Sequence, residues 1–214
     1  MRRRAEAAYG PADFARDLDV SRETLARFVA YEALIRRWQP AINLVGGRTL
    51  DDLWRRHFLD SGQLLGHLPA AYDALYDIGS GAGFPGLVLA LLGAHDVTLI
   101  ESDARKCAFL RETARETGAA VTVLNARVEA LAPPADGWPR SRVLVARAVA
   151  PLGTLLDHAR GLIDANARCI VLKGEGAAAE LAAAGRRWTM KVETIQSISD
   201  SRGVVLKLSG MAHV

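Results

Sequence analysis

Hydrophobic and polar positions follow two different patterns along the chain. Up to about residue 70, apolar residues recur at the spacing of helices, as at Leu25, Phe28 and Leu34 behind the serine N-cap signal at Ser21. From Ala74 onward, short apolar runs alternate with longer helical stretches. We therefore predict an N-terminal helical extension over residues 1–70, packed on an α/β domain over residues 71–214.

The apolar runs of the second part predict seven strands. Helices fit between the first five, and the final two runs are separated by only a short polar turn, so they are expected to form an antiparallel pair. A Rossmann-like, seven-stranded, mostly parallel sheet with an antiparallel terminal strand is typical of class I S-adenosylmethionine-dependent methyltransferases. A dinucleotide-binding domain usually has six parallel strands. The predicted strands are 74–78, 97–101, 121–125, 143–146, 169–172, 190–197 and 203–208, and the predicted helices among them 86–93, 103–117, 151–163 and 175–186.

A glycine-rich turn after the first predicted strand holds the strongest chemical signal. Gly81, Gly83 and Gly86 satisfy the dinucleotide pattern G-x-G-x-x-G, with Glu101 at a suitable distance for a ribose. Asp77, however, lies where a dinucleotide would place its pyrophosphate, and the two anions would repel each other. S-adenosylmethionine instead offers a sulfonium and an ammonium, which favour a carboxylate. We therefore predict a methyl-donor site, with a dinucleotide-dependent oxidoreductase or a turn that binds nothing as alternatives.

Two further segments are candidates for the rest of the donor. Glu101 ends the second predicted strand, where an acid accepts hydrogen bonds from ribose hydroxyls. The backbone of Val128 and the side chain of Glu129 follow the third strand, where an adenine would lie. The alternatives are a helix N-cap region for the first and a solvated loop for the second.

Two cations directly follow predicted strands. Arg147 comes after the fourth strand and Lys173 after the fifth, and in open α/β sheets the active site lies outside those strand ends. An anion such as an RNA phosphate would account for both, and Arg147 is also a candidate for the donor carboxylate. The alternative is pairing with a local acid such as Glu129 or Asp77.

Missing motifs narrow the acceptor. The chain has no Asn-Pro-Pro-aromatic or Asp-Pro-Pro-aromatic tetrad after the fourth strand and no Pro-Cys or Thr-Cys pair, so a cysteine nucleophile is unsupported. An acceptor that needs no deprotonation fits such a site. Guanine N7 is one, because its lone pair is free at neutral pH and needs only alignment.

Composition adds modest constraints. Net charge is +3, and only four of the 27 basic residues are lysines; arginine suits phosphate contacts, although a G+C-rich genome explains the bias equally well. No apolar run approaches the roughly 18 residues of a membrane span. Two cysteines form neither a disulfide framework nor a metal cluster. We expect a cytoplasmic monomer without a metal.

These segments together closely resemble the small-subunit ribosomal RNA methyltransferase G family, also called glucose-inhibited division protein B. The resemblance runs in order from about residue 31 to 175. It departs at Gln39-Pro40-Ala41, where the family usually has Asn-x-Lys, so a basic residue near the presumed RNA path is missing. The matching segments are Trp38 to Leu44, Arg56 to Ser61, Asp77 to Gly86, Glu101 to Leu110, Arg127 to Glu129, Ala146 to Ala148 and Leu172 to Gly174.

The resemblance implies N7 methylation of one guanosine in the 530 loop of 16S ribosomal RNA, with S-adenosylmethionine as donor and the RNA or the 30S subunit as partner. It implies donor contacts for Gly79, Phe84, Val128, Glu129 and Arg147. It also implies an RNA-facing cleft lined by Asn43, His57, Asp60, Arg147 and Lys173. By themselves His57 and Asp60, three apart on one helical face, fit packing as well as function. A non-catalytic RNA-binding module on the same fold is a further alternative.

Overall fold

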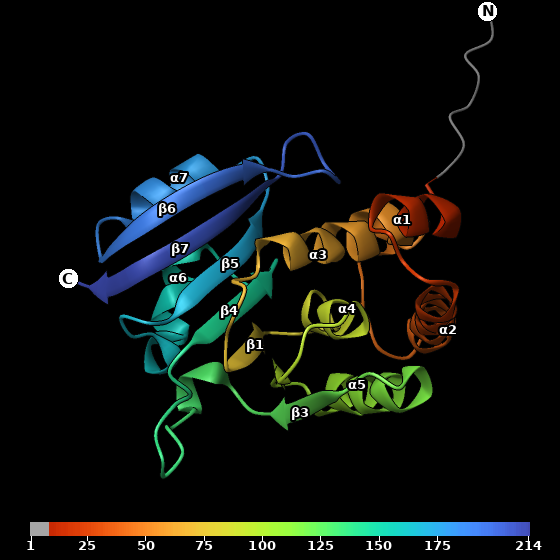
Figure 1. Cartoon of the computed structure of the whole chain (residues 1–214), viewed down its shortest axis with the longest axis horizontal. Helices are drawn as coiled ribbons and strands as arrows, with labels where there is room; N and C mark the ends of the chain where they lie inside the picture. Colours follow the sequence, from red (N-terminus) through yellow and green to blue (C-terminus); the bar gives the residue numbers. More distant parts are fainter. Residues whose placement is uncertain (1–8) are drawn as a thin grey trace, which may run out of the picture.

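The computed structural model describes residues 9–214, so residues 1–8 of the predicted extension lie outside it. Its centre is a seven-stranded sheet of order β3-β2-β1-β4-β5-β7-β6 (Figure 1). The first five strands are parallel, and β7 runs antiparallel between β5 and β6. The predicted class I methyltransferase fold is confirmed. The strands are β1 (Ala74–Ile78), β2 (Val97–Glu101), β3 (Val121–Asn125), β4 (Arg142–Arg147), β5 (Arg168–Lys173), β6 (Trp188–Gln196) and β7 (Val204–His213).

The N-terminal part is helical, as predicted. Ser21 caps its longest helix, since the Ser21 Oγ accepts a hydrogen bond from the Thr24 backbone N at 3.2 Å. The later part is less regular than an α-helix, with π and 3₁₀ turns in sequence. The elements are α1 (Pro11–Asp17), α2 (Arg22–Trp38), the 3₁₀ turn η1 (Gly47–Thr49), the π-helix η2 (Trp54–Leu59), α3 (Asp60–Gly62) and the 3₁₀ helix η3 (Gln63–His67).

The crossover helices begin and end where local chemistry directs. The Asp103 carboxylate caps α5 by accepting from the Arg105 backbone N at 2.8 Å, and Gly118 ends it with φ +64°. The predicted helix over 151–163 is instead a short α-helix followed by a 3₁₀ turn that contains Gly161, a poor helix former. These elements are α4 (Gly86–Leu91), α5 (Ala104–Thr117), η4 (Val128–Ala130), α6 (Leu152–His158), η5 (Arg160–Leu162) and α7 (Ala177–Ala184).

Each face of the sheet has its own core. On one face, Phe14 and Phe28 of the N-terminal helices belong to the same buried cluster as Leu99 and Val143 of the sheet. On the other face, α6 and α7 pack on the alternate residues of β4, β5 and β7. The extension therefore shares a core with the sheet, while the division at residue 70 stays a prediction. Within residues 9–214, no helix has the length and apolarity needed to cross a membrane.

Candidate active site

A cleft of about 960 Å³ opens at the carboxyl ends of β1, β2, β4 and β5. This is where open α/β sheets bind ligands, and the volume lies within the range of small-molecule sites. The glycine turn, the η1–η2 region, the loop after β4 and the β6–β7 hairpin all contribute to its lining. The predicted site residues that line it are His57, Asp60, Gly79, Gly81, Phe84, Glu101, Arg147 and Lys173.

The glycine turn requires glycine for two different reasons. Gly79 and Gly81 line the cleft with φ of +66° and +56°, a conformation that favours glycine. A Cβ on Gly79 would lie 2.9 Å from Cγ2 of Val149, which packs against the turn from the loop after β4. Gly83 does not line the cleft: a Cβ there would collide with the Tyr31 hydroxyl and with Leu87. Gly83 therefore serves packing against Tyr31, whereas Gly79 and Gly81 are required by the positive φ of the turn at the cleft.

Glu101 fastens this turn to the second strand. Its Oε2 accepts from the Gly81 backbone N at 2.9 Å, and its Oε1 accepts from the Asp103 backbone N at 2.8 Å. Each carboxylate oxygen keeps a further lone pair, and the residue is only 8% exposed at the cleft. Its role as a ribose ligand stays a prediction, and its contact with Gly81 was not expected from the sequence.

Asp77 lies beneath the turn and does not line the cleft. The side chain is completely buried; its Oδ2 accepts from the Gly86 backbone N at 3.0 Å, and its Oδ1 has no partner among the described residues. Burial raises the pKa of the Asp77 carboxyl to about 7, against the lowering effect of its hydrogen bonds and of Arg147. A buried carboxylate with one unpartnered oxygen fits a cationic donor held above it.

Three side chains of the cleft lining form a hydrogen-bonded series: Arg147, His57 and Thr49. Burial, followed by the charge of Arg147, lowers the pKa of His57 to about 3, so the imidazole is neutral. Arg147 Nη2 donates to His57 Nδ1 at 2.6 Å. The proton of the neutral ring must then be on Nε2, which donates to Thr49 Oγ1 at 2.8 Å. Thr49 Oγ1 in turn donates a hydrogen bond to the Gly46 carbonyl oxygen at 2.8 Å. Donor and acceptor are therefore assigned for each of these hydrogen bonds.

Asp60 links Arg147 to the β6–β7 hairpin. Its Oδ2 lies 3.5 Å from Arg147 Nη1, and its Oδ1 accepts from Ser199 Oγ at 2.5 Å. Gln63 strengthens this contact, because its Nε2 donates to Ser197 Oγ at 3.0 Å and its Oε1 accepts from the Ile198 backbone N at 3.0 Å. No sequence pattern pointed to Ser197, Ser199 or Gln63, and the polar hairpin turn was expected only to connect its two strands.

The Arg147 guanidinium packs on an aromatic ring of the glycine turn. The Arg147 guanidinium carbon lies 4.9 Å from the centre of the Phe84 ring, and His57 lies 4.9 Å from the same ring. Tyr31 of α2 stacks on Phe84 at 5.7 Å and donates its hydroxyl proton to the Ala82 carbonyl. The N-terminal extension therefore contacts the glycine turn directly. Phe84 is 4% exposed, so most of its surface serves this stack.

Lys173 reaches the cleft but has an acidic partner. Its Nζ lies 2.8 Å from Glu180 Oε2 and donates to the Ala150 carbonyl at 2.6 Å, and the side chain is 8% exposed. The predicted pair of cations is thus present, with Asp60 on Arg147 and Glu180 on Lys173. The acids considered from the sequence, Glu129 and Asp77, are not these partners. Lys173 holds the loop that carries Val149 against the glycine turn.

Besides Gly83 and Asp77, three more predicted residues lie away from the cleft lining. Val128 is half-buried in η4, and Glu129 is exposed, with its Oε1 3.4 Å from His158 Nδ1. Asn43 is exposed and accepts from Gln39 Nε2 at 3.1 Å. Gln39, where the sequence departs from the family, also accepts from the backbone N of Leu44 and thereby orders a cleft-lining segment. The ligand roles of Val128, Glu129 and Asn43 stay predictions.

Comparison with known proteins agrees with this architecture. The family model described as rRNA small subunit methyltransferase G matches residues 24–205. The ribosomal RNA small subunit methyltransferase G of Rhodospirillum centenum is 52% identical over 96% of this chain and 93% of its own length. The protein of the same name from Rhodospirillum rubrum is 50% identical over 92% of this chain and 96% of its own length. A SAM-dependent methyltransferase from Aquifex aeolicus superposes with a TM-score of 0.54 at 17% identity, covering 77% of this chain and 95% of that structure.

Proposed function

The chain belongs to the rRNA small subunit methyltransferase G family, and from that premise we propose that it methylates N7 of one guanosine in the 530 loop of 16S ribosomal RNA. S-adenosylmethionine is the proposed donor. We further propose that the enzyme works as a cytoplasmic monomer.

The observation that carries the choice of acceptor is that the titratable side chains expected to face the RNA, His57, Asp60 and Lys173, already have hydrogen-bond or ion-pair partners. His57 is neutral because its pKa is lowered to about 3, but its Nδ1 lone pair already accepts from Arg147. Asp60 is bound by Ser199 and Arg147, and Lys173 by Glu180. Such a site suits an acceptor that attacks with an existing lone pair. Methylation at guanine N7 meets this requirement, since it transfers positive charge to the ring and releases no proton.

The residues around the glycine turn fit the proposed donor. When bound, S-adenosylmethionine supplies a methyl group activated by a sulfonium. Gly79 and Gly81 open the turn, Glu101 offers free lone pairs at its edge, and Asp77 supplies negative charge beneath it. Such preorganised charge costs no reorganisation during transfer. Asp77 is therefore proposed to act on the donor by its field through the turn.

Arg147 is proposed to orient the RNA-facing wall. Its guanidinium is fixed by His57, Asp60 and the Phe84 ring, so it presents a rigid cationic surface beside the glycine turn. A fixed cation places a nucleotide without losing side-chain entropy at each turnover. Val149, 39% exposed at the cleft, adds an apolar surface on which a base can rest.

The test is methyl transfer from labelled S-adenosylmethionine to 30S subunits that lack the modification, and to naked 16S RNA. The modified site is then mapped by N7-specific strand cleavage. We expect one labelled guanosine in the 530 loop. Label on another base would contradict the proposed acceptor. Isothermal titration with NAD in place of the methyl donor tests the oxidoreductase alternative, and tight RNA binding without turnover would favour a non-catalytic binding module.

A further inference from the structure

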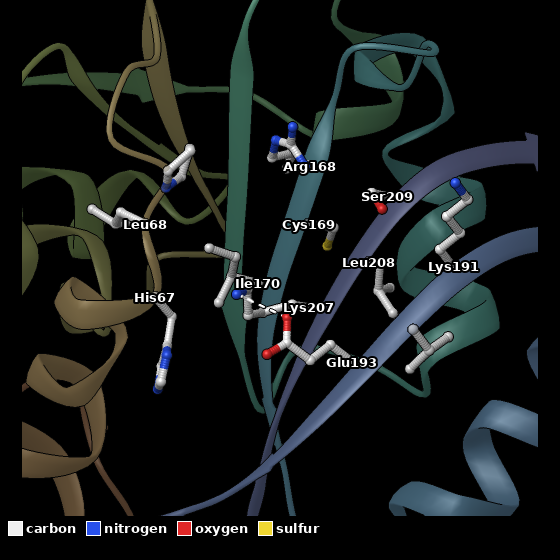
Figure 2. A pocket seen from close by; sticks show the side chains of 12 residues that line it. His67, Leu68, Arg168, Cys169, Ile170, Lys191, Glu193, Lys207, Leu208 and Ser209 are labelled. Carbon is white, nitrogen blue, oxygen red and sulfur yellow. Dashed lines mark ion pairs between the residues drawn. The ribbon is translucent and has the colours of Figure 1, made fainter.

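A second set of hollows lies at the opposite ends of the strands, on the face of β5, β7 and β6 that α7 leaves free. Figure 1 shows α7 behind β6 and β7 and, among residues 9–214, no helix across their front. Two adjoining hollows of about 380 and 520 Å³ open there (Figure 2 shows the first). They share Arg168, Lys191 and Ser209. None of these three residues belongs to the lining of the methyl-transfer cleft.

Positive charge gathers at these hollows with little to balance it. Arg140, Arg168, Lys191 and Lys207 contribute four cations, against the single acid Glu193. Glu193 pairs with Lys207 at 2.9 Å, as the dashed line in Figure 2 marks. The other three cations are exposed, and the described part of the chain gives none of them an acidic partner. By contrast, both predicted cations of the cleft are paired.

Strand pairing sets the spacing of this charge. Arg168 of β5 pairs with Ser209 of β7, which in turn pairs with Lys191 of β6. Neighbouring strands lie about 4.8 Å apart, so the Cα atoms of Arg168 and Lys191 are separated by about 10 Å, with the Ser209 hydroxyl between them. Ser209 is half-buried, and its hydroxyl makes no hydrogen bond to any other part of residues 9–214. Arg140 lies at the edge of the same hollow.

Phosphate oxygens are bound by groups of the kind found around this hollow: an arginine guanidinium, a lysine ammonium and a hydroxyl donor. We infer that this surface, the amino-end patch (Arg140, Arg168, Lys191 and Ser209), binds backbone phosphates of the ribosomal RNA outside the methyl-transfer cleft. The choice of RNA rests on the proposed function. The chemistry of the patch, phosphate recognition, stands on the geometry alone.

One strand connects the patch to the cleft. β5 begins with Arg168 at the patch and ends with Lys173 at the cleft. Five steps of about 3.3 Å place the two ends about 17 Å apart. An RNA segment of a few nucleotides is long enough to cover that distance. One short RNA segment can therefore enter the cleft and contact the patch together, which places the target nucleotide from two points.

The test compares R168Q/K191Q with a matched control, R22Q/R111Q, whose two cations likewise have no acidic partner among residues 9–214. The control also removes two exposed cations, from α2 and α5 at the other end of the sheet. Binding of a 16S RNA fragment containing the 530 loop is followed by fluorescence anisotropy at several salt concentrations, without methyl donor. Each lost phosphate contact lowers the slope of log affinity against log salt by about 0.7 to 0.9. We expect R168Q/K191Q to lower the slope by about 1.5, to raise KM for RNA about tenfold and to leave kcat unchanged, while the control matches wild type.

The outcomes separate this inference from the proposed function. An unchanged slope in R168Q/K191Q with normal turnover overturns the patch alone. Wild-type protein that binds RNA through the patch and transfers no methyl group overturns the proposed function alone. If R168Q/K191Q binds RNA normally but is slower than wild type in methylating 30S subunits and not in methylating naked RNA, the patch contacts a protein of the subunit instead. If inorganic phosphate competes for the patch as strongly as RNA does at the same phosphate concentration, the patch binds a free anion. Either of these two results overturns the RNA assignment. Unchanged thermal unfolding verifies that the variants fold.

Discussion

Replacing Asp77 with asparagine tests the electrostatics beneath the glycine turn. The carboxyl is completely buried with one unpartnered oxygen, and burial raises its pKa from 3.8 to about 7. Asparagine has nearly the same shape, and its carbonyl oxygen can accept the same hydrogen bond from the Gly86 backbone N. The substitution therefore removes the ionisation while keeping the packing.

The sign and size of the effect follow from proton linkage. Because the folded protein holds this proton more tightly than the unfolded chain, stability is greatest below about pH 4 and falls as the pH rises towards 7. A pKa raised from 3.8 to about 7 corresponds to a total loss of about 4 kcal/mol. More than half of that loss, about 2 to 3 kcal/mol, falls between pH 5 and pH 8. The asparagine of D77N does not ionise, so the variant would carry no such penalty.

Urea unfolding of wild type and D77N at pH 5 and pH 8 measures this difference. We expect D77N to be the more stable protein at pH 8, with its advantage shrinking by about 2 to 3 kcal/mol at pH 5. D77N should also bind S-adenosylmethionine more weakly. The affinity of the wild type for S-adenosylmethionine should rise about tenfold from pH 6 to pH 8, relative to that of D77N. The comparison with D77N cancels the titration of the donor's own amino group. A stability difference independent of pH would refute the reasoning.

Three further predictions concern other residues that line the cleft: Ser199, Lys173 and His57. S199A removes the hydroxyl that donates to Asp60, so kcat should fall about tenfold with unchanged donor affinity, and S199T should restore it; equal loss in both would contradict this role. K173M leaves Glu180 without its cation and should lower the free energy of unfolding by about 2 kcal/mol, with recovery in K173M/E180Q, as measured in urea. Because the pKa of His57 is about 3, kcat at saturating donor should stay constant from pH 6 to pH 9, and an inflection near pH 6.5 that persists in D77N would disprove a neutral imidazole.

The fold was predictable because strand signals here are local. Each of the five parallel strands is a short apolar run bounded by polar or glycine-rich segments, and their predicted positions agree with the structure to within a residue. The last two strands are longer than predicted: β7 continues to His213 through polar and glycine positions, because pairing with β6 extends it. Helix ends shifted where glycines such as Gly161 interrupt the pattern.

The resemblance brought His57, Asp60, Arg147 and Lys173 to one cleft, but from the residues alone the site was predictable only where one segment supplies its own geometry. Gly79 and Gly81 need positive φ in a strand-to-helix turn, which a sequence pattern records. The partners of Arg147 could not be found in this way, since Asp60 and Ser199 lie 87 residues before it and 52 after it. A serine in a polar hairpin turn has no periodic signal. Only the closing of β6 and β7 onto Gln63 brings that turn to the cleft.

The contacts of Tyr31 argue that the N-terminal extension belongs to the active site. Its hydroxyl holds the Ala82 carbonyl within the glycine turn, and its ring covers Phe84, on which Arg147 rests. Without the extension, Phe84 and much of the sheet's apolar face would meet water, at a cost of about 25 cal/mol for each Å² exposed. The predicted division at residue 70 would therefore separate two architectures that share one hydrophobic core. The N-terminal helices therefore help to position both the glycine turn and Arg147.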